Sequence, residues 1–155
     1  MSEAVICAVA RTPVGRFRGA LREHSAVDLG VMAVSELLRR AGIAAESGLV
    51  DEVIFGQVLQ AGAGQAPARQ VTLRAGLPPK TAAVTINKVC GSSLKAIMLA
   101  ANSIRAGEYE VIVAGGMESM TNAPHFVRQP NKGEDVAFTN LQTTLVHDGL
   151  WDAFN

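Results

Sequence analysis

Residues 81–106 read TAAVTINKVCGSSLKAIMLAANSIRA, and this stretch decides the fold that we expect for the chain. Residues 81–86 predict a short buried strand, and residues 91–104 predict a helix. Cys90 lies between them, where the unpaired N–H groups and the positive dipole end of a helix favour a thiolate over a thiol. Because a thiolate is the nucleophilic form of cysteine, Cys90 is a candidate for covalent catalysis.

Strand-like and helix-like segments alternate along the first 120 residues. Residues 5–9 (VICAV) form a continuous apolar run, which is typical of a strand that is covered on both faces. Ser25 is a candidate N-cap for a helix over residues 26–40 that ends at Gly42. The remaining segments are a buried strand over 50–55, a short helix over 66–75 and a further strand over 110–114. This alternation predicts an α/β fold, with a mostly parallel sheet and helices on both faces.

The sequence changes character after residue 120. Residues 121–140 are polar, contain Pro, Gly and Asn, and show little periodicity, so they predict a long excursion from the sheet. A helix-like segment over 139–146 follows, and the chain then stops after two aromatic residues. We therefore expect one part over residues 1–120 and a second over residues 121–155, in a chain that is cut or that continues in a partner.

Composition narrows the class of protein. The 155 residues carry no net charge and 48% of them are apolar, which suits one domain. Without a basic face or tail, neither nucleic acid nor an anionic membrane is expected as a partner. No apolar run approaches the ~18 residues of a transmembrane helix, and the N-terminus lacks the basic residues of a signal peptide. Cys7 and Cys90 lie far apart without metal-ligand spacing, which favours a reduced, soluble, cytoplasmic protein without a metal site.

The two cysteines and the glycine pair at 115–116 have structural as well as functional interpretations. Cys7 lies within the apolar run over 5–9, where we expect a buried neutral thiol that serves packing alone. Cys90 could itself be a small buried hydrophobe, which is what most unpaired cysteines are. Gly115-Gly116-Met117-Glu118 follows the last predicted strand beside the expected crevice, and indicates either a close backbone approach or a plain turn.

Arginines and histidines offer weaker candidates. Four arginines lie in one loop. They could bind phosphate, but we favour ion pairs, for which Glu23 and Asp28 are nearby partners. Gly62-Ala63-Gly64 lacks the third glycine of a dinucleotide fingerprint and predicts a tight turn. The three histidines are expected to be solvated rather than to act as a base for Cys90. These arginines and histidines are Arg11, Arg16, Arg18, Arg22, His24, His125 and His147.

The segment around Cys90, residues 86–96 (INKVCGSSLKA), resembles the nucleophile motif of thiolases. Four further segments resemble other signatures of that family, in the same order along the chain. They are residues 11–17 (RTPVGRF), 64–70 (GQAPARQ), 114–120 (AGGMESM) and 148–154 (DGLWDAF). Ser93 and Ala66 depart mildly from the family, which often has Gly and Asn there. The chain is thus similar to the N-terminal part of a thiolase, an acetyl-CoA acetyltransferase or 3-ketoacyl-CoA thiolase.

The resemblance implies a reaction and a role for Cys90. In thiolases a cysteine takes an acyl group from a CoA thioester, and a second substrate then attacks the acyl-enzyme. Carried over, Cys90 is the acyl-accepting nucleophile, coenzyme A thioesters are the substrates, and no cofactor stays bound. The activating histidine, second cysteine, Asn-bearing loop and oxyanion hole of the family have no matching motif in residues 1–155. No substrate-binding residue is assigned.

The resemblance also implies architecture and partners. Thiolases are longer and fold as two similar halves with an inserted loop domain, so residues 1–120 would be an incomplete first half and residues 121–155 the start of the loop domain. A homodimer or homotetramer is implied, or a companion chain with the C-terminal half, and a role in fatty acid metabolism. Residues 1–155 alone are expected to be inactive. Two alternatives stay open: a ketoacyl synthase-like condensing enzyme, and a non-catalytic thiolase-like subunit or scaffold.

Overall fold

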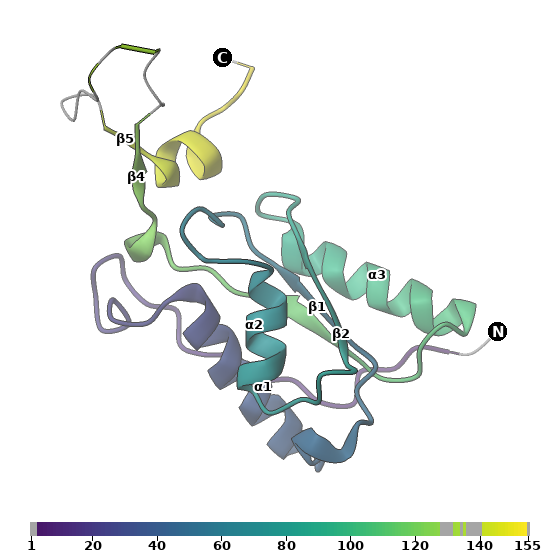
Figure 1. The fold of residues 1–155 in the computed structure, drawn as a ribbon. Helices are drawn as coiled ribbons and strands as arrows, with labels where there is room; N and C mark the ends of the chain where they lie inside the picture. The colour runs from purple at the N-terminus through teal and green to yellow at the C-terminus, as the bar shows by residue number, and fades with distance from the viewer. Residues whose placement is uncertain (1–2, 128–131, 134, 136–140, 155) are drawn as a thin grey trace.

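The computed structural model describes most of the chain, namely residues 3–127, 132–133, 135 and 141–154. Its centre is a parallel sheet of three strands in the order β2-β1-β3 (Figure 1). The strands are β1 (Glu52–Gly56), β2 (Ala82–Ile86) and β3 (Ile112–Gly116). Because the three strands run in the same direction, their carboxyl ends meet at one edge, where Gly56 lies between Ile86 and Gly116.

Three helices cover the two faces of this sheet. They are α1 (Ala26–Ala41), α2 (Pro67–Arg74) and α3 (Ser92–Ala106). α1 and α2 pack together on one face, where Val53 and Phe55 of β1 belong to the larger core. α3 covers the other face, where Ala96 and Ala100 pack against Ile54. Neighbouring residues of β1 thus enter opposite cores, as the period of two in a strand requires. The predicted α/β fold with helices on both faces is confirmed.

Local sequence explains where α1 begins and ends. The Asp28 N–H donates to Ser25 Oγ at 3.1 Å, and the Ser25 N–H donates to Asp28 Oδ2 at 2.9 Å, which makes a reciprocal capping box. Gly42 ends the helix with φ of 68°, a left-handed conformation that glycine adopts without strain. The other predicted helices and strands between residues 50 and 116 lie within two residues of their expected bounds.

The strand predicted over residues 5–9 is absent. These residues belong to no ladder, and Val5, Ile6 and Val9 are 70%, 77% and 67% exposed. Cys7 is exposed as well, so the prediction of a buried thiol is wrong. An apolar run becomes a buried strand only where neighbouring strands pair with it and helices cover it. The described part of the chain supplies neither for these residues.

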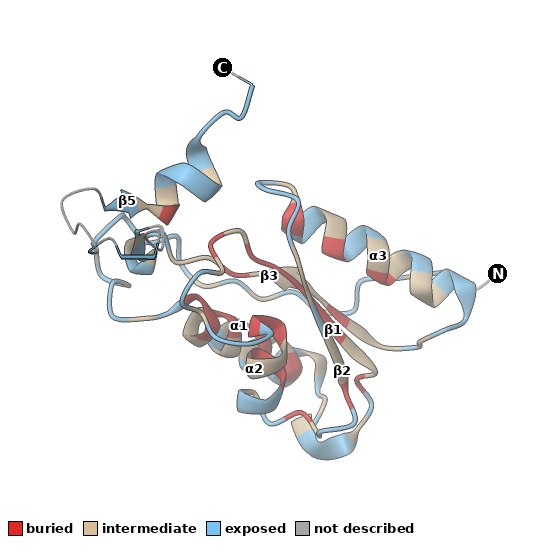
Figure 2. Cartoon of the chain, turned by 45° about the horizontal axis from the view of Figure 1, so that its top comes forward, coloured by how far each residue is buried: buried red, intermediate tan, exposed pale blue. Residues whose placement is uncertain are grey.

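The strand predicted to be buried over residues 81–86 and the helix that follows it are each covered on one side only. β2 is an edge strand of the sheet, and its Val84 is 39% exposed. α3 packs Ala96 and Ala100 against the sheet, whereas Leu94, Ile97 and Met98 are exposed. Exposed residues follow the outer side of this helix in Figure 2. Periodicity in the sequence indicates which side chains are suited to burial, but not whether the described chain covers them.

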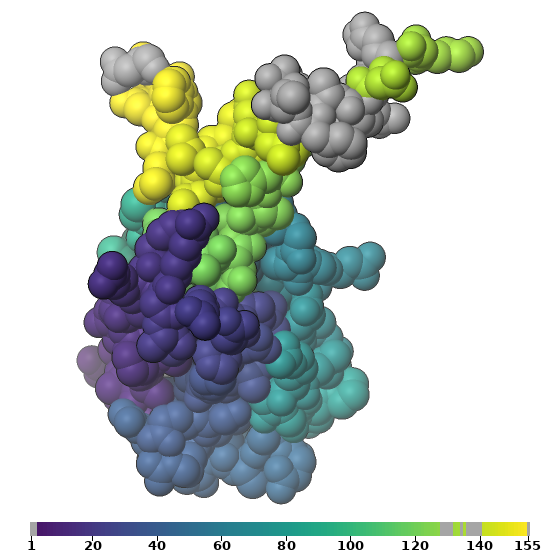
Figure 3. Space-filling view, turned by 90° about the vertical axis from the view of Figure 1, so that its left-hand side faces the viewer, coloured from purple at the N-terminus to yellow at the C-terminus, as the bar shows by residue number. Residues whose placement is uncertain are grey.

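The chain leaves the sheet after β3. The short strands β4 (His125–Phe126) and β5 (Gln142–Thr143) pair antiparallel, and the π-helix η4 (Leu145–Leu150) follows. These elements project from the α/β body (Figure 3). The prediction of a helix over 139–146 is wrong at residues 142–143, which form β5. Some residues of the predicted excursion lie outside the described residues, namely 128–131, 134 and 136–140. The division into 1–120 and 121–155 stays a prediction.

Two 3-10 turns complete the described elements, η1 (Ala45–Ser47) and η2 (Met120–Asn122). η2 connects β3 to the projecting segment, and Asn122 Nδ2 donates to the His24 carbonyl oxygen at 2.9 Å, which fixes this connection to the loop before α1. None of the described helices is long and apolar enough to cross a membrane.

Candidate active site

An open cavity of about 520 Å³ lies at the carboxyl edge of the sheet. Residues that follow all three strands line it: 56–58 at the end of β1, 89–90 after β2 and 116–121 at the end of β3. The N-terminal loop over 10–17 forms a further part of its wall. In open α/β sheets, ligands bind in the crevice outside the carboxyl ends of the strands. This cavity is therefore the place in the fold where a ligand is expected.

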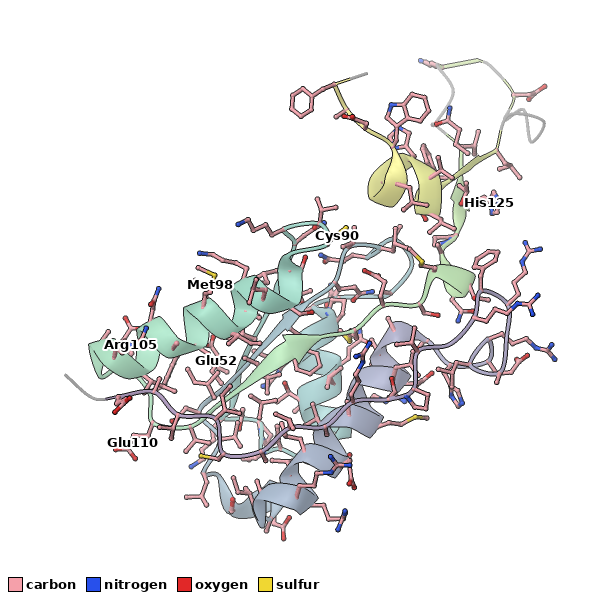
Figure 4. All side chains as sticks on the ribbon, turned by 180° about the vertical axis from the view of Figure 1, so that it is seen from behind. Glu52, Cys90, Met98, Arg105, Glu110 and His125 are labelled. Atoms are coloured by element: carbon pink, nitrogen blue, oxygen red, sulfur yellow. The ribbon has the colours of Figure 1, made fainter. Side chains whose placement is uncertain are left out.

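Cys90 lies on the turn between β2 and α3, at the N-terminal end of the helix (Figure 4). Its side chain is exposed and lines the cavity, so Cys90 is not a buried packing residue in the described structure. Val89, directly before it, has φ of 48°. A left-handed conformation is strained for a β-branched residue, by about 1–3 kcal/mol, and such strain is found mostly at functional sites.

Two side chains hold this turn in place. Ser92 Oγ accepts a hydrogen bond from the Lys88 N–H at 2.8 Å and donates one to the Val89 carbonyl oxygen at 2.6 Å. Asn87 Oδ1 accepts from the Val89 N–H at 2.9 Å. The strained residue before Cys90 is therefore bonded on both its N–H and its carbonyl side.

Gly56 and Gly116 allow α3 to approach the sheet closely. A Cβ atom at Gly56 would lie 2.5 Å from Ser92 Cβ and 2.8 Å from the Ser93 backbone nitrogen. A Cβ atom at Gly116 would lie 2.8 Å from the Gly56 carbonyl oxygen and would also collide with Ser93 Oγ. Both positions require glycine because of this close packing. The predicted close backbone approach at the glycine pair is confirmed for Gly116.

Glu118 joins the loops that follow β1 and β3. Its Oε2 accepts from the Val58 N–H at 2.9 Å, and its Oε1 accepts from the Leu59 N–H at 3.1 Å. Gln57 is 2% exposed and lines the cavity, and its Oε1 has no hydrogen-bond partner among the described residues. A buried acceptor without a donor costs about 1–3 kcal/mol.

The arginine-rich loop faces both the cavity and the solvent. Arg11 and Arg16 line the cavity. Arg22 forms the predicted ion pair with Glu23, with Nε and Oε1 2.8 Å apart, and both side chains are exposed. The Arg18 guanidinium carbon lies 5.2 Å from the centroid of the neighbouring Phe17 ring. Among the described residues, the ion-pair interpretation is thus confirmed for Arg22 alone.

The three histidines of the chain all lie in its described part, and none lines the cavity. His147 pairs with Asp148 in η4, with 2.8 Å between Nδ1 and Oδ1. His125 lies on β4 and points away from Cys90 (Figure 4). The described residues therefore place no histidine beside the thiol. They also bring together no group of His, Cys, Asp and Glu that could hold a metal ion.

Three carboxylates in the described chain have a displaced pKa, and all lie outside the cavity. The pKa of Asp28 is lowered to about 2, by hydrogen bonds from Ser25 and then from Arg74 of α2. Asp28 thus pairs with α2 and not, as predicted, with the arginine-rich loop. The pKa of Glu36 is also lowered to about 2, by two neighbouring arginines of α1. Burial, and then a nearby negative charge, raise the pKa of Glu52 at the start of β1.

Comparison with known proteins decides the family. Residues 4–155 match the family described as Thiolase, N-terminal domain. The chain belongs to the thiolase family. It is 52% identical over 155 residues to a probable acetyl-CoA acetyltransferase of Escherichia coli strain K12. It is 50% identical over 155 residues to an acetyl-CoA acetyltransferase of Cupriavidus necator.

The structure supports the same assignment. A crystal structure of the Acat5 thiolase from Ascaris suum in complex with coenzyme A matches 99% of this chain with a TM-score of 0.89 and 39% sequence identity. This thiolase chain spans 39% of the length of that structure and of both bacterial relatives. The thiolase resemblance of the sequence is confirmed.

Sequence reasoning located Cys90 and the segment at 115–118, but missed the residues that support them. Ser92, Asn87 and Gly56 flank the end of a strand or the start of the helix, which is a weak signal for such a role. Asn87 and Ser92 bond within the turn itself, but the role of Gly56 depends on packing against Ser92 across more than thirty residues of chain.

Proposed function

We propose that this chain carries the nucleophile of a thiolase-type acyltransferase, and that Cys90 is that nucleophile. One observation carries the proposal: Cys90 is an exposed thiol at a helix N-terminus that lines the cavity at the carboxyl edge of the sheet, in a chain of the thiolase family. The reaction is the transfer of an acyl group, acetyl in the first instance, between coenzyme A thioesters.

The chemistry consists of two half-reactions. In the first, the Cys90 sulfur attacks the carbonyl carbon of acetyl-CoA, the bond from that carbon to the CoA sulfur breaks, and CoA leaves as a thiol with the proton that Cys90 gave up. In the second, another acetyl-CoA loses a proton from its methyl group and attacks the acetyl carbon on Cys90. This step forms acetoacetyl-CoA and regenerates the thiol, and the reverse sequence is thiolysis of a 3-ketoacyl-CoA.

Proton transfer in this scheme needs groups outside residues 1–155. The histidine, second cysteine, Asn-bearing loop and oxyanion hole that the family uses come from segments after the part that this chain matches. We propose that they are supplied by the remaining part of a complete thiolase, in the same chain or in a companion chain. Residues 1–120 then form an incomplete first half, and residues 121–155 begin the loop domain.

The substrates and surroundings follow from the same proposal. The substrates are coenzyme A thioesters, without a bound cofactor, and the Acat5 relative with coenzyme A bound supports this choice. The complete enzyme is a homodimer or homotetramer in the cytoplasm, with a role in fatty acid metabolism.

Acetylation of Cys90 tests the proposal. The complete protein, this chain together with the C-terminal half, is incubated with acetyl-CoA, quenched, digested and analysed by mass spectrometry. We expect one acetyl group on Cys90, none on Cys7, and loss of the label when CoA is added. A folded complete protein that leaves Cys90 unmodified would favour the non-catalytic scaffold. Preferential acylation by an acyl-carrier thioester would favour the ketoacyl synthase-like enzyme.

Residues 1–155 alone should lack turnover. The isolated chain has the thiol but none of the groups to which proton transfer is assigned above. The assay measures CoA-dependent cleavage of acetoacetyl-CoA as the loss of absorbance of its enolate. We expect no steady cleavage by the isolated chain, and recovery of cleavage when the C-terminal half is present. Sustained cleavage by the isolated chain would show that residues 1–155 contain a complete active site.

A further inference from the structure

Ser92 is a buried polar residue beside Cys90 to which the reaction above assigns no role. We propose that its hydroxyl positions Cys90 for attack by fixing the peptide group between Val89 and Cys90. The inference rests on the proposed role of Cys90 as nucleophile. Ser92 is then a positioning residue, which acts on the thiol through the backbone and not on the substrate.

Both hydrogen-bonding functions of the Ser92 hydroxyl are used within the turn. It donates its proton to the Val89 carbonyl oxygen at 2.6 Å, and it accepts from the Lys88 N–H at 2.8 Å. A serine hydroxyl has one proton to donate, so Ser92 has none left for a substrate oxygen. The Val89 carbonyl belongs to the peptide group that leads into Cys90. Holding this oxygen therefore sets the direction in which the Cys90 side chain leaves the backbone.

The turn needs such a restraint because Val89 is held in a strained conformation. With φ of 48°, Val89 would relax if its peptide groups were free to rotate. Relaxation of Val89 would rotate the following peptide and turn the Cys90 thiol away from its position in the cavity wall. The hydroxyl of Ser92 opposes this rotation at the Val89 carbonyl, and the bond from the Lys88 N–H fixes the hydroxyl to the start of the turn.

Ser92 is itself held rigidly. The residue is 4% exposed and lies so close to the end of β1 that a Cβ atom at Gly56 would be 2.5 Å from Ser92 Cβ. The sheet therefore fixes Ser92, and Ser92 fixes the turn. Other bonds remain when the hydroxyl is removed: the Ser92 N–H donates to the Val89 carbonyl at 3.1 Å, and Asn87 Oδ1 accepts from the Val89 N–H at 2.9 Å. We therefore expect Ser92→Ala to fold and to loosen the turn locally.

Thr72 provides a matched control. It is fully buried, its hydroxyl donates to the Ala68 carbonyl oxygen at 2.8 Å, and it lies in α2 outside the cavity. Thr72→Val removes a buried hydroxyl and its hydrogen bond without touching the turn at Cys90. Comparison of the two variants separates a positioning effect from a general loss of stability.

The test compares two reactions of the same thiol in the complete protein. Acetylation of Cys90 by saturating acetyl-CoA depends on the direction of attack, and a misplacement of about 1 Å can cost ~10²-fold in rate. Alkylation by iodoacetamide, a small reagent that can approach from many directions, depends on it far less. For Ser92→Ala we expect acetylation to slow by about 10- to 100-fold and alkylation by less than about threefold. Thr72→Val should leave both rates of Cys90 unchanged.

Amide hydrogen exchange at Lys88 gives a second readout that does not depend on activity. It should become faster in Ser92→Ala, because the Lys88 N–H loses its acceptor, and should stay unchanged in Thr72→Val. Four results would overturn the inference: acetylation of Ser92→Ala at the wild-type rate, an equal loss in Thr72→Val, equal loss of acetylation and alkylation in Ser92→Ala, or a melting temperature far below that of Thr72→Val. A wild-type protein that is not acetylated at Cys90 is a distinct outcome, because it refutes the proposed function and the inference together.

Discussion

Replacement of Gly56 by alanine should displace Cys90 without changing any residue of its turn. Gly56 ends β1, and α3 begins directly against it. The new Cβ atom would lie 2.5 Å from Ser92 Cβ and 2.7 Å from the Ser92 carbonyl carbon. Neither neighbour is the end of a flexible side chain, so the N-terminal turn of α3 has to move.

The size of the movement follows from the contact distance. Ordinary contact begins at 3.4 Å, so the helix end has to retreat from the sheet by roughly 0.9 Å, and overpacking of this kind costs about 1–3 kcal/mol of stability. Cys90 lies on the turn that leads into this helix end and should move with it. A displacement near 1 Å lowers the rate of an oriented reaction by ~10²-fold, which corresponds to about 2.7 kcal/mol on the activation barrier.

Gly115→Ala is the matched control for Gly56→Ala. Gly115 lies on the neighbouring strand, paired with Phe55, and a Cβ atom there would meet the Phe55 ring at an ordinary 3.5 Å. The assay is single-turnover acetylation of Cys90 in the complete protein, with thermal unfolding measured in parallel. We expect a loss of about 10²-fold for Gly56→Ala, and a loss within about threefold for Gly115→Ala, where the new methyl group fits.

Two results would refute this reasoning. If acetyl-CoA acetylates Cys90 in the Gly56→Ala variant within about threefold of the wild-type rate, the close approach of α3 to β1 does not determine the position of the thiol. If Gly115→Ala is equally impaired, the effect comes from a methyl group at the strand ends in general and not from the contact with Ser92.

Three further predictions concern the surroundings of the site. Asp28→Ala removes the Asp28 half of the capping box and the ion pair with Arg74, and should lower the free energy of unfolding at pH 7 by about 1–2 kcal/mol. Because the pKa of Asp28 is lowered to about 2 in the folded chain, this stabilisation is present above pH ~4 and is lost as the pH falls through about 2. The urea unfolding curves of wild type and variant should therefore converge at about pH 2. A constant difference between the two curves down to about pH 2 would contradict this prediction. Glu118→Ala removes the acceptor of two backbone N–H groups in the loop after β1, whose hydrogen exchange should accelerate by about tenfold; unchanged exchange would mean that Glu118 does not hold this loop. Acetyl-CoA should protect Cys90 but not Cys7 from alkylation in the complete protein, although both thiols are exposed in this structure; equal labelling of both in its presence would count against a substrate site at Cys90.

The local elements of this thiolase chain could be predicted from sequence because their signals are local. Ser25, Asp28 and Gly42 bound α1 by hydrogen bonds and a glycine conformation that involve only neighbouring residues. The place of Cys90 between a strand and a helix follows in the same way. The prediction of a buried strand over residues 5–9 is wrong for the opposite reason. Burial of a strand requires partners from elsewhere in the chain, and apolar side chains alone do not supply them.

The sequence by itself determined the order of strands and helices, the position of Cys90 between β2 and α3, and the resemblance that led to the thiolase family. Only the tertiary structure decided what surrounds the thiol. Gly56 and Glu118 act across more than thirty residues of chain, where Gly56 allows α3 to approach the sheet and Glu118 joins two loops. Ser92 restrains the turn through neighbouring residues, but its own position depends on packing against the distant Gly56. Such contacts depend on how parallel strands bring their ends to one edge, because only packing of whole elements makes these residues neighbours.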